Sequence, residues 1–336
     1  MARHENLVSR ALRRAYLFKH PTTRRLVRAG FIGVPASAAT IVAMALVEGP
    51  ALVPVALLAG VCGGVLGSLI VRALRPLGDR LFGVTTTGRL LELANPAHPL
   101  MRKLMTSAPG TYTHSVVTAN LAETAAEVIG ANPLVARVGG YYHDIGKMVR
   151  PEFFFENLAG GDNPHDDATP DLSTRIIIGH VRDGLELAEA YHLPREIEDI
   201  IGEHHGTSVV KCFYRKAAEA DASVFESSFR YPAALPHTRE AALVMLADGC
   251  EAAVRAKRTP SDDEVAATVS GVVEDRECDG QLAASGLNAA DIDMVVRSYT
   301  RILASMYHPR MEYPDSAPRR EQDADIHHEP SRARTA

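Results

Sequence analysis

A long apolar block lies near the start of the chain, from Ala29 to Val71, and Glu48 is its only charged residue. The turn-forming sequence Glu48-Gly49-Pro50 divides the block into apolar runs of 19 and 21 residues. At about 1.5 Å of rise per residue, a helix of either length crosses a hydrocarbon core of about 30 Å. The pattern therefore predicts a hairpin of two transmembrane helices within residues 29–74.

Basic residues flank this hairpin on both sides. Six of them precede the first run between Arg13 and Arg28, and Arg72, Arg75 and Arg80 follow the second run. The positive-inside rule places both ends of the hairpin in the cytoplasm and Glu48 in a short external turn. We therefore expect a multi-pass protein of the cell (inner) membrane, with the lipid bilayer as a partner and both termini in the cytoplasm. A cleaved signal peptide fits poorly, because a second apolar run follows at once; a buried helical hairpin of a soluble protein is the alternative.

The rest of the chain shows the periodicity of helices with one apolar face. In Tyr112–Ile129, apolar residues recur at Val117, Leu121, Ala125 and Val128, which is a helical stripe. No run of alternating residues indicates a strand, so the predicted fold class is all-α. The same periodicity predicts further helices over Pro133–His143, Leu172–His192, Arg195–His205, Arg239–Arg255, Asp262–Glu277 and Ala289–Tyr307, the last introduced by Asn288 as its cap.

These helices define one all-helical domain over residues 111–310. Residues 75–110 are expected to be a connector that carries one short helix around Leu90–Leu93. Residues 1–28 form a basic cytoplasmic N-terminus. Residues 311–336 are polar and lack apolar periodicity, which predicts a disordered tail. The expected architecture is therefore a two-helix transmembrane hairpin followed by a helical domain.

Charge divides the chain in the same way as hydropathy. Residues 1–28 carry +7, whereas the overall net charge is -5, so the part that follows the apolar block carries -11. An acidic domain is a poor platform for a large nucleic acid, and we expect none as a partner. The four cysteines, Cys62, Cys212, Cys250 and Cys278, show no paired spacing. This fits a reduced cytoplasmic domain rather than a disulfide framework or a zinc ribbon.

Histidine and aspartate residues recur on the inner faces or at the ends of five successive predicted helices. Taken singly, each histidine is more simply a hydrogen-bonded core residue, but an unpaired buried aspartate must find a cation or a donor. No cluster of buried lysine or arginine is predicted beside them. Metal ions are therefore the simplest partners for the whole set, which comprises His114, His143, Asp144, His180, His204, His205 and Asp248.

Seven such ligands are too many for one tetrahedral site. They suit two octahedral ions that share one bridging carboxylate and leave positions open for water. Two ions about 3.5–4 Å apart clamp the attacking and leaving oxygens of a phosphoryl transfer and lower the pKa of a bridging water. Mixed imidazole and carboxylate ligands favour manganese, iron or zinc over magnesium or calcium. The expected cofactors are two divalent transition metal ions, with manganese or iron preferred.

Five sequence blocks in this order resemble the HD-domain phosphohydrolase superfamily. The blocks are Ala108–Ser115 (APGTYTHS), Tyr141–Met148 (YYHDIGKM), Arg150–Phe154 (RPEFF), Glu203–Thr207 (EHHGT) and Phe229–Pro232 (FRYP). They are most similar to the seven-transmembrane HD family, whose members are cyclic di-AMP phosphodiesterases. The resemblance covers roughly residues 85–308 and the two apolar runs before them. A His-Asp pair alone is weak evidence, but five blocks in order are strong evidence.

The resemblance implies a role for each ligand. One metal is held by His114, His143, Asp144 and Asp248, and the other by Asp144, His180, His204 and His205, so that Asp144 bridges the two. It further implies attack of a metal-bridging hydroxide on phosphorus, departure of the 3′ oxygen, and the linear product pApA. Asp144 and Lys147 are the expected catalytic residues, because Lys147 falls one turn past the metal pair, where its ammonium can hold a phosphate oxygen.

Five residues are expected to contact the substrate: Lys147, Arg150, Thr207, Arg230 and Tyr231. The arginines and the lysine would meet phosphate by charge, and Tyr231 would stack on a base. Each has a structural alternative. Lys147 and Arg150 also suit solvated positions, Thr207 suits the cap of the next helix, and Arg230-Tyr231 suits a turn before Pro232.

The chain departs from the seven-transmembrane family in one respect. Members of that family have seven spans and a large extracytoplasmic domain, whereas two runs precede the HD blocks here and look like the last two of the seven. A second copy of the chain or a partner membrane chain is therefore a candidate for supplying the remaining spans.

The leading hypothesis is a membrane-anchored, metal-dependent phosphodiesterase that hydrolyses cyclic di-AMP to pApA. A hydrolase of another nucleotide, such as cyclic di-GMP, pApA or a mononucleotide, is the first alternative. A non-catalytic receptor for a cyclic dinucleotide is the second. The cyclic di-GMP branch carries Gly-Tyr-Pro soon after its paired histidines, whereas Gly206-Thr207-Ser208 follows the pair here, so that branch is disfavoured.

Overall fold

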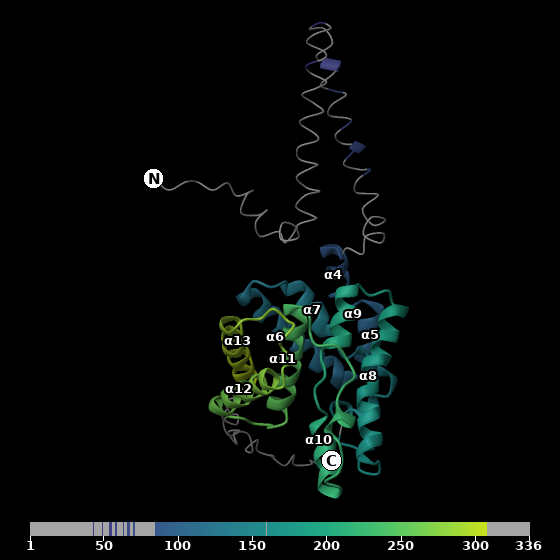
Figure 1. The fold of residues 1–336 in the computed structure, drawn as a ribbon. Helices are drawn as coiled ribbons and strands as arrows, with labels where there is room; N and C mark the ends of the chain where they lie inside the picture. Colours follow the sequence, from purple (N-terminus) through teal and green to yellow (C-terminus); the bar gives the residue numbers. More distant parts are fainter. Residues whose placement is uncertain are drawn as a thin grey trace, which may run out of the picture.

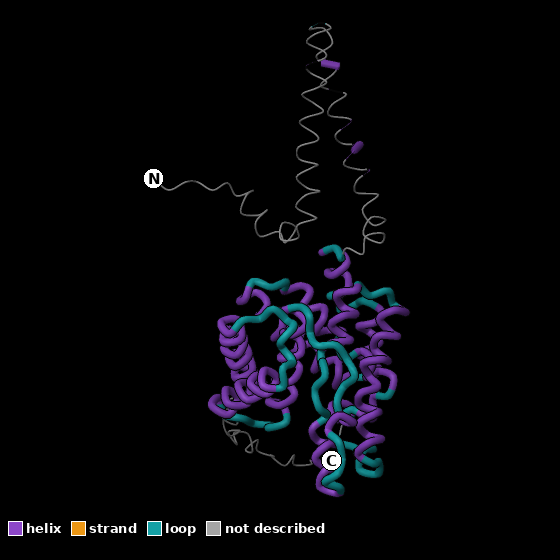
Figure 2. Tube along the Cα trace, in the orientation of Figure 1, coloured by secondary structure: helices purple, strands orange, loops and turns teal. Residues whose placement is uncertain are grey.

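The computed structural model describes residues 85–158 and 160–307, together with isolated positions 43, 49, 54, 55, 58, 63, 66, 67 and 70. The described chain is helical, as predicted, and its only β pairing is one isolated bridge between Val209 and Arg230 (Figure 2). Short 3-10 helices η3 (Ile145–Val149), η4 (Pro151–Phe153), η5 (Phe155–Asn157) and η6 (Glu226–Phe229) connect longer ones. The α-helices are α4 (Thr87–Leu93), α5 (Pro99–Ser107), α6 (Pro109–Ile129), α7 (Pro133–Tyr142), α8 (Pro170–Ala190), α9 (Arg195–Glu203), α10 (Lys211–Ala220), α11 (Arg239–Arg255), α12 (Asp262–Cys278) and α13 (Ala289–Tyr307).

The predicted transmembrane hairpin and the predicted disordered tail lie outside the described residues, apart from the isolated positions above. Among the helices that are described, none combines the length and the apolar character needed to cross a bilayer.

Local sequence signals set most of the helix boundaries. Proline occupies the first turn of α5, α6, α7 and α8, where its missing N–H costs no hydrogen bond. Side chains of Asn132, Thr169 and Thr238 accept the first free amides of α7, α8 and α11. The predicted cap of α13 is confirmed, because Asn288 Oδ1 accepts from Asp291 N at 3.0 Å.

Helix α6 lies at the centre of the larger apolar core. Its buried residues, including Leu121, Ala122 and Ala125, pack with α11, α12 and α13. Helix α7 crosses α6 closely, because Gly140 has no side chain: a Cβ there would lie 2.5 Å from Ala119 Cα. In Figure 1, α12 and α13 lie on one side of α6 and α11, and α5, α8 and α9 lie on the other. The centre of the domain is thus the junction of α6, α7, α8, α9 and α11.

Helix α5 was not predicted by the apolar pattern, yet it belongs to the second core cluster. Its buried residues Leu100, Met101 and Leu104 share that cluster with Tyr142 and Ile145, which flank the His143-Asp144 pair. Each such side chain contributes about 1.5–3 kcal/mol when fully buried. The segment before α6 therefore supports the helices that carry the histidines.

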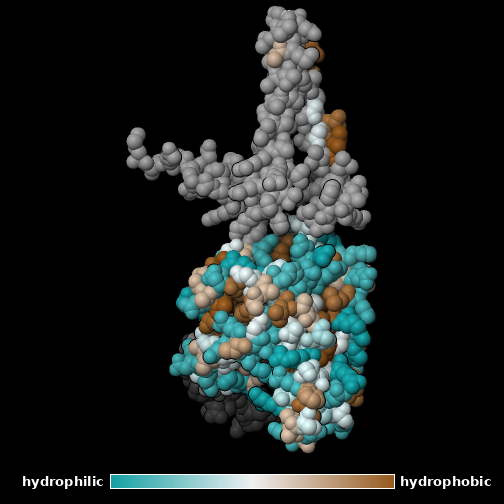
Figure 3. All heavy atoms as spheres, viewed as in Figure 1, coloured by the Kyte–Doolittle hydropathy of each residue, from teal (hydrophilic) through white to brown (hydrophobic). Residues whose placement is uncertain are grey.

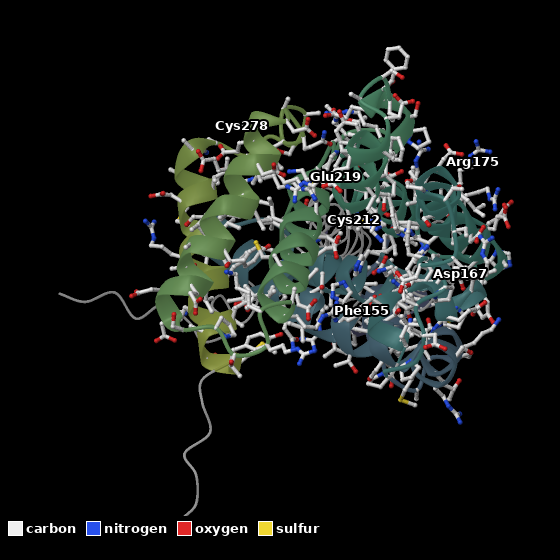
Figure 4. All side chains as sticks on the ribbon, turned by 90° about the horizontal axis from the view of Figure 1, so that it is seen from below. Phe155, Asp167, Arg175, Cys212, Glu219 and Cys278 are labelled. Atoms are coloured by element: carbon white, nitrogen blue, oxygen red, sulfur yellow. The ribbon has the colours of Figure 1, made fainter. Side chains whose placement is uncertain are left out.

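The visible surface of the helical domain mixes hydrophilic and apolar side chains (Figure 3). The three cysteines in the described part of the chain are all free. Cys212 and Cys278 are exposed and come from α10 and α12 (Figure 4), whereas Cys250 is buried in α11.

Candidate metal centre

The structure brings all seven predicted ligands together in one cluster, of which five are buried and His205 and Asp248 are partly buried. His114 comes from α6, His180 from α8 and Asp248 from α11, while the two remaining pairs follow the ends of α7 and α9. Their donor atoms form two groups, in each of which every atom lies within 4.8 Å of the others. The first group consists of His114, His143, Asp144 and Asp248. The second consists of Asp144, His180, His204 and His205, so Asp144 belongs to both groups.

Asp144 faces the two groups with different oxygens. Its Oδ2 lies 3.2 Å from His143 Nε2 and 3.6 Å from His114 Nε2. Its Oδ1 lies 3.3 Å from His180 Nε2 and 3.6 Å from His204 Nε2. One carboxylate therefore spans both donor groups, which is the geometry required of a bridging ligand.

Hydrogen bonds hold most of the imidazole rings with Nε2 pointing inward. The Nδ1 atoms of His143, His180 and His204 each donate to the carbonyl three residues earlier, at 2.8, 2.5 and 2.8 Å. His114 Nδ1 instead contacts the carboxylate of Glu251 at 2.5 Å. Because a carbonyl can only accept, Nδ1 of the first three rings carries the proton and Nε2 presents its lone pair to the centre.

Four of the inward-facing donor atoms lack hydrogen-bond partners within the described residues. These buried atoms are Nε2 of His114, Nε2 of His143 and both oxygens of Asp144, although Lys147 Nζ makes an ion-pair contact of 2.7 Å with Asp144 Oδ2. Buried polar atoms are almost always partnered in folded proteins, and an unpaired charge is costly. Divalent cations bound between the two carboxylates and the imidazoles would satisfy all of these atoms, so the residues present fit a pair of metal ions.

Comparison with known proteins shows which family this helical domain resembles. Residues 111–253 match the HD domain family. The crystal structure of the HD domain of the Listeria monocytogenes phosphodiesterase PgpH, in complex with cyclic di-AMP, superimposes with a TM-score of 0.62 at 43% sequence identity, over 63% of this chain and 100% of that one. The chain belongs to the HD-domain family. The resemblance predicted from the sequence blocks is thereby confirmed.

Two curated relatives extend beyond the HD domain. The chain is 40% identical over 305 residues to the cyclic di-AMP phosphodiesterase PgpH of Bacillus subtilis. The aligned residues cover 90% of this chain and 43% of that protein. It is 45% identical over 240 residues to PgpH of L. monocytogenes, and these aligned residues cover 71% of this chain and 33% of that protein. The chain thus spans less than half the length of either relative.

Charge at the centre of the HD domain favours cation binding. Burial opposes ionisation of Asp144, but Lys147 and His143 outweigh it and hold the pKa of Asp144 well below its usual range. Burial also opposes ionisation of Asp248, but interactions with the rings of His114 and His205 outweigh that effect and lower the pKa of Asp248. Both carboxylates are therefore ionised at neutral pH.

His114 holds a proton where a metal would bind. Burial lowers the pKa of His114, but the nearby carboxylates of Asp248, 3.1 Å from Nε2, and Glu251 outweigh that effect and raise the pKa to about 10. A metal bound by His114 would replace this proton, so metal binding would be accompanied by proton release.

Lys147 lies beside Asp144 and is held there by a second carboxylate. Its Nζ is 3.0 Å from Glu156 Oε1, and Glu156 also accepts from Thr111 Oγ1 at 3.2 Å. Asn157 Oδ1 accepts from Gly110 N and Thr111 N at the start of α6. The η5 segment therefore ties Lys147 to the helix that carries His114, and sequence reasoning did not find Glu156 or Asn157.

The other predicted substrate contacts differ in their surroundings. The Tyr231 ring stacks on His205, with centroids 4.3 Å apart, so the structure places it at the centre. Arg150 pairs with Asp183 at 2.5 Å. Arg230 and Thr207 belong to a hydrogen-bonded network beside the histidine pair, where Arg230 Nη1 donates to Thr207 O at 2.8 Å. Thr207 does not cap the next helix, because Val210 occupies the cap position of α10.

Glu251 is a further residue of the centre that sequence reasoning missed. It lies three residues after Asp248 on α11, hence on the same helix face, and is 3% exposed. Its carboxylate fixes the ring of His114, as carboxylates commonly do for metal-bound histidines. The spacing from Asp248 is the signal that could have found it.

We expect Glu251→Gln to weaken metal binding by about 10-fold or more, because the neutral amide orients His114 less firmly. Manganese affinity measured by isothermal titration calorimetry tests this. Glu203→Gln is the matched control, because Glu203 is also buried and contacts a histidine Nδ1 at 2.5 Å, but that histidine is His237, outside both donor groups. Equal affinities of the two variants would contradict the role of Glu251.

Proposed function

We propose that this chain is a two-metal phosphodiesterase that hydrolyses cyclic di-AMP to pApA. The single observation that carries the proposal is the cluster of seven donors, in which Asp144 faces both groups. Support for the substrate comes from the PgpH relatives and from the PgpH HD domain solved with cyclic di-AMP, the whole of which this chain covers at 43% identity.

The proposed cofactors are two divalent transition metal ions, manganese or iron. A donor set of five imidazoles and two carboxylates suits these metals better than magnesium or calcium. When bound, they supply Lewis-acid polarisation of the phosphoryl group and a hydroxide nucleophile at neutral pH.

The chain's own residues orient the reaction in this proposal. Asp144 sets the separation of the two donor groups, and the Nδ1 hydrogen bonds of the histidines restrict their rings. Burial lowers the pKa of Lys147, but the charges of Asp144 and Glu156 outweigh burial and raise that pKa. Lys147 is therefore kept protonated. Its ammonium is then placed to hold a non-bridging phosphate oxygen. Tyr231 is proposed to contact a base, and Arg150, Thr207 and Arg230 to contact the rest of the dinucleotide.

We further propose that residues 29–74 anchor the enzyme in the cell membrane, with residues 1–28 and the HD domain in the cytoplasm. The two charge-free runs and their basic flanks support this arrangement. In this arrangement residues 75–110 connect the membrane to the HD domain of residues 111–310.

The test is a substrate panel on the full chain, extracted from membranes with detergent and loaded with manganese or iron. We expect hydrolysis of cyclic di-AMP to pApA, and loss of activity when EDTA removes the metal. Cleavage of cyclic di-GMP, pApA or a mononucleotide in place of cyclic di-AMP would overturn the substrate. Tight binding of cyclic di-AMP without turnover under any metal would instead identify a receptor.

A further inference from the structure

His205 is held differently from the other four histidines of the centre. Their Nδ1 atoms contact backbone carbonyls or Glu251, whereas the nearest acidic oxygen recorded for His205 Nδ1 is Asp248 Oδ2, at 3.7 Å. That distance is too long for a hydrogen bond. One face of the ring is covered by Tyr231. The position of His205 therefore depends on the backbone of the turn that follows it.

The turn after His205 is fixed through Thr207. The Thr207 amide donates to Gln281 Oε1 at 2.9 Å, and the Thr207 hydroxyl accepts from Gln281 Nε2 at 2.9 Å. The Thr207 carbonyl accepts from Arg230 Nη1 at 2.8 Å. The amide, the hydroxyl and the carbonyl of this residue are thus all held by side chains distant in the sequence.

Gln281 is well placed to hold the turn because the end of α12 fixes its backbone. Gly280 adopts φ +71°, Gly280 N donates to Glu277 O, and Gln281 N donates to Arg276 O at 2.9 Å. This pair of bonds is the Schellman motif, in which glycine at this position is favoured. The Gln281 side chain is 1% exposed, so it is confined against the turn.

Gly206 brings the turn and Gln281 into direct contact. A Cβ on Gly206 would lie 2.3 Å from Gln281 Oε1 and 3.1 Å from Met245 Cε. Met245 lies three residues before Asp248 on α11. The turn is therefore packed between the helix that carries Asp248 and the loop that carries Gln281.

Asp279 joins Gln281 to Arg230 in one network. Its Oδ1 accepts from Arg230 Nη2 at 2.8 Å, and its Oδ2 accepts from Gln281 Nε2 at 2.8 Å. Both side chains that hold Thr207 are therefore oriented by the same carboxylate. Neither Asp279 nor Gln281 lies within residues 111–253, which match the HD domain family.

We propose that Gln281, oriented by Asp279, is a positioning residue for His205 and hence for the metal held by Asp144, His180, His204 and His205. The proposal rests on the two-metal part of the proposed function. Buried partners behind a metal ligand typically contribute about 10–100-fold to metal affinity. The segment after α12 thereby completes the metal centre from outside the matched HD region.

The experiment measures manganese binding to the full chain and to Gln281→Leu, which keeps the size of the side chain and removes its hydrogen bonds. We expect the wild-type chain to bind two ions and Gln281→Leu to bind one ion normally and the other about 10-fold or more weakly. Electron paramagnetic resonance should show the coupled two-manganese signal replaced by that of a single ion at limiting metal.

Ser285→Ala is the matched control. Ser285 is 3% exposed and bonds to Leu282 O and Leu287 N in the same loop, but has no recorded contact with the 206–208 turn. Ser285→Ala should reduce the stability of the chain without weakening the ion held by Asp144, His180, His204 and His205. Thr207→Val, which removes only the hydroxyl partner of Gln281, should weaken the same ion and serves if Gln281→Leu does not fold.

Unchanged affinity for both ions in folded Gln281→Leu would overturn the positioning role, as would an equal loss in Ser285→Ala. Fewer than two ions in the wild-type chain would overturn the two-metal proposal itself. Two ions without hydrolysis of cyclic di-AMP would overturn the proposed substrate and leave the role of Gln281 standing.

Discussion

Replacement of Asp144 by asparagine is expected to lower the turnover number of the proposed hydrolysis of cyclic di-AMP by about 10³-fold or more. Asparagine keeps the shape of the side chain but removes its negative charge and one acceptor oxygen. Since Oδ1 and Oδ2 each face a different donor group, both groups lose a ligand or its charge at once. Removing several kcal/mol of electrostatic stabilisation, at about 1.4 kcal/mol for each factor of ten, gives this magnitude.

Turnover and metal content should be measured together on Asp144→Asn, with binding of cyclic di-AMP by calorimetry as a second readout. Asp291→Asn is the control, because Asp291 is a buried aspartate paired with Arg239 and lies outside both donor groups. It should reduce stability and leave turnover within a few-fold of wild type. Substantial turnover by Asp144→Asn would rule out the bridging role, and unchanged nucleotide binding without turnover would separate catalysis from recognition.

Much of the helical fold could be predicted because most helices have long apolar stripes with clear ends. The bounds of α11 and α13 match the prediction, since Thr238 and Asn288 cap helices of 17 and 19 residues. Helix α5 was missed because nine residues hold only three buried positions, too few for a stripe to be distinguished from a loop. What reveals α5 is its packing in the core shared with α7 and η3, which depends on tertiary structure.

The seven donors could be predicted because each falls on an apolar face or at a helix end, where a titratable residue is unexpected. Glu251 was missed because its spacing from Arg255 also fits an ordinary surface ion pair, although its spacing from Asp248 places both on one helix face. Gln281 lies 74 residues from Thr207, so its contact arises only when α12 packs against α11. The metal ligands can thus be predicted from local sequence patterns, whereas the residues that orient them are identified only from long-range packing.

Gly146, two residues after Asp144, shows how close packing between helices affects the geometry of the metal centre. A Cβ on Gly146 would lie 1.9 Å from His180 O and 2.5 Å from Gly184 N, both of which are backbone atoms of α8. No rotation of a side chain can relieve such contacts, so η3 and α8 would have to separate. Asp144 and His180 sit at the two sides of this contact, with Oδ1 and Nε2 3.3 Å apart.

Gly146→Ala is therefore expected to lower the turnover number by about 10²-fold, the typical effect of a displacement of about 1 Å in an active site. Overpacking should also reduce the free energy of unfolding by about 1–3 kcal/mol.

Gly271→Ala is the matched control, since Gly271 is exposed in the interior of α12 and a Cβ there meets nothing within 4 Å. Alanine should stabilise that helix by about 0.5–1 kcal/mol and leave turnover unchanged. Chemical denaturation and steady-state kinetics on both variants test the pair. Wild-type turnover in Gly146→Ala would show that the spacing of α8 and η3 does not govern the alignment of Asp144 with His180.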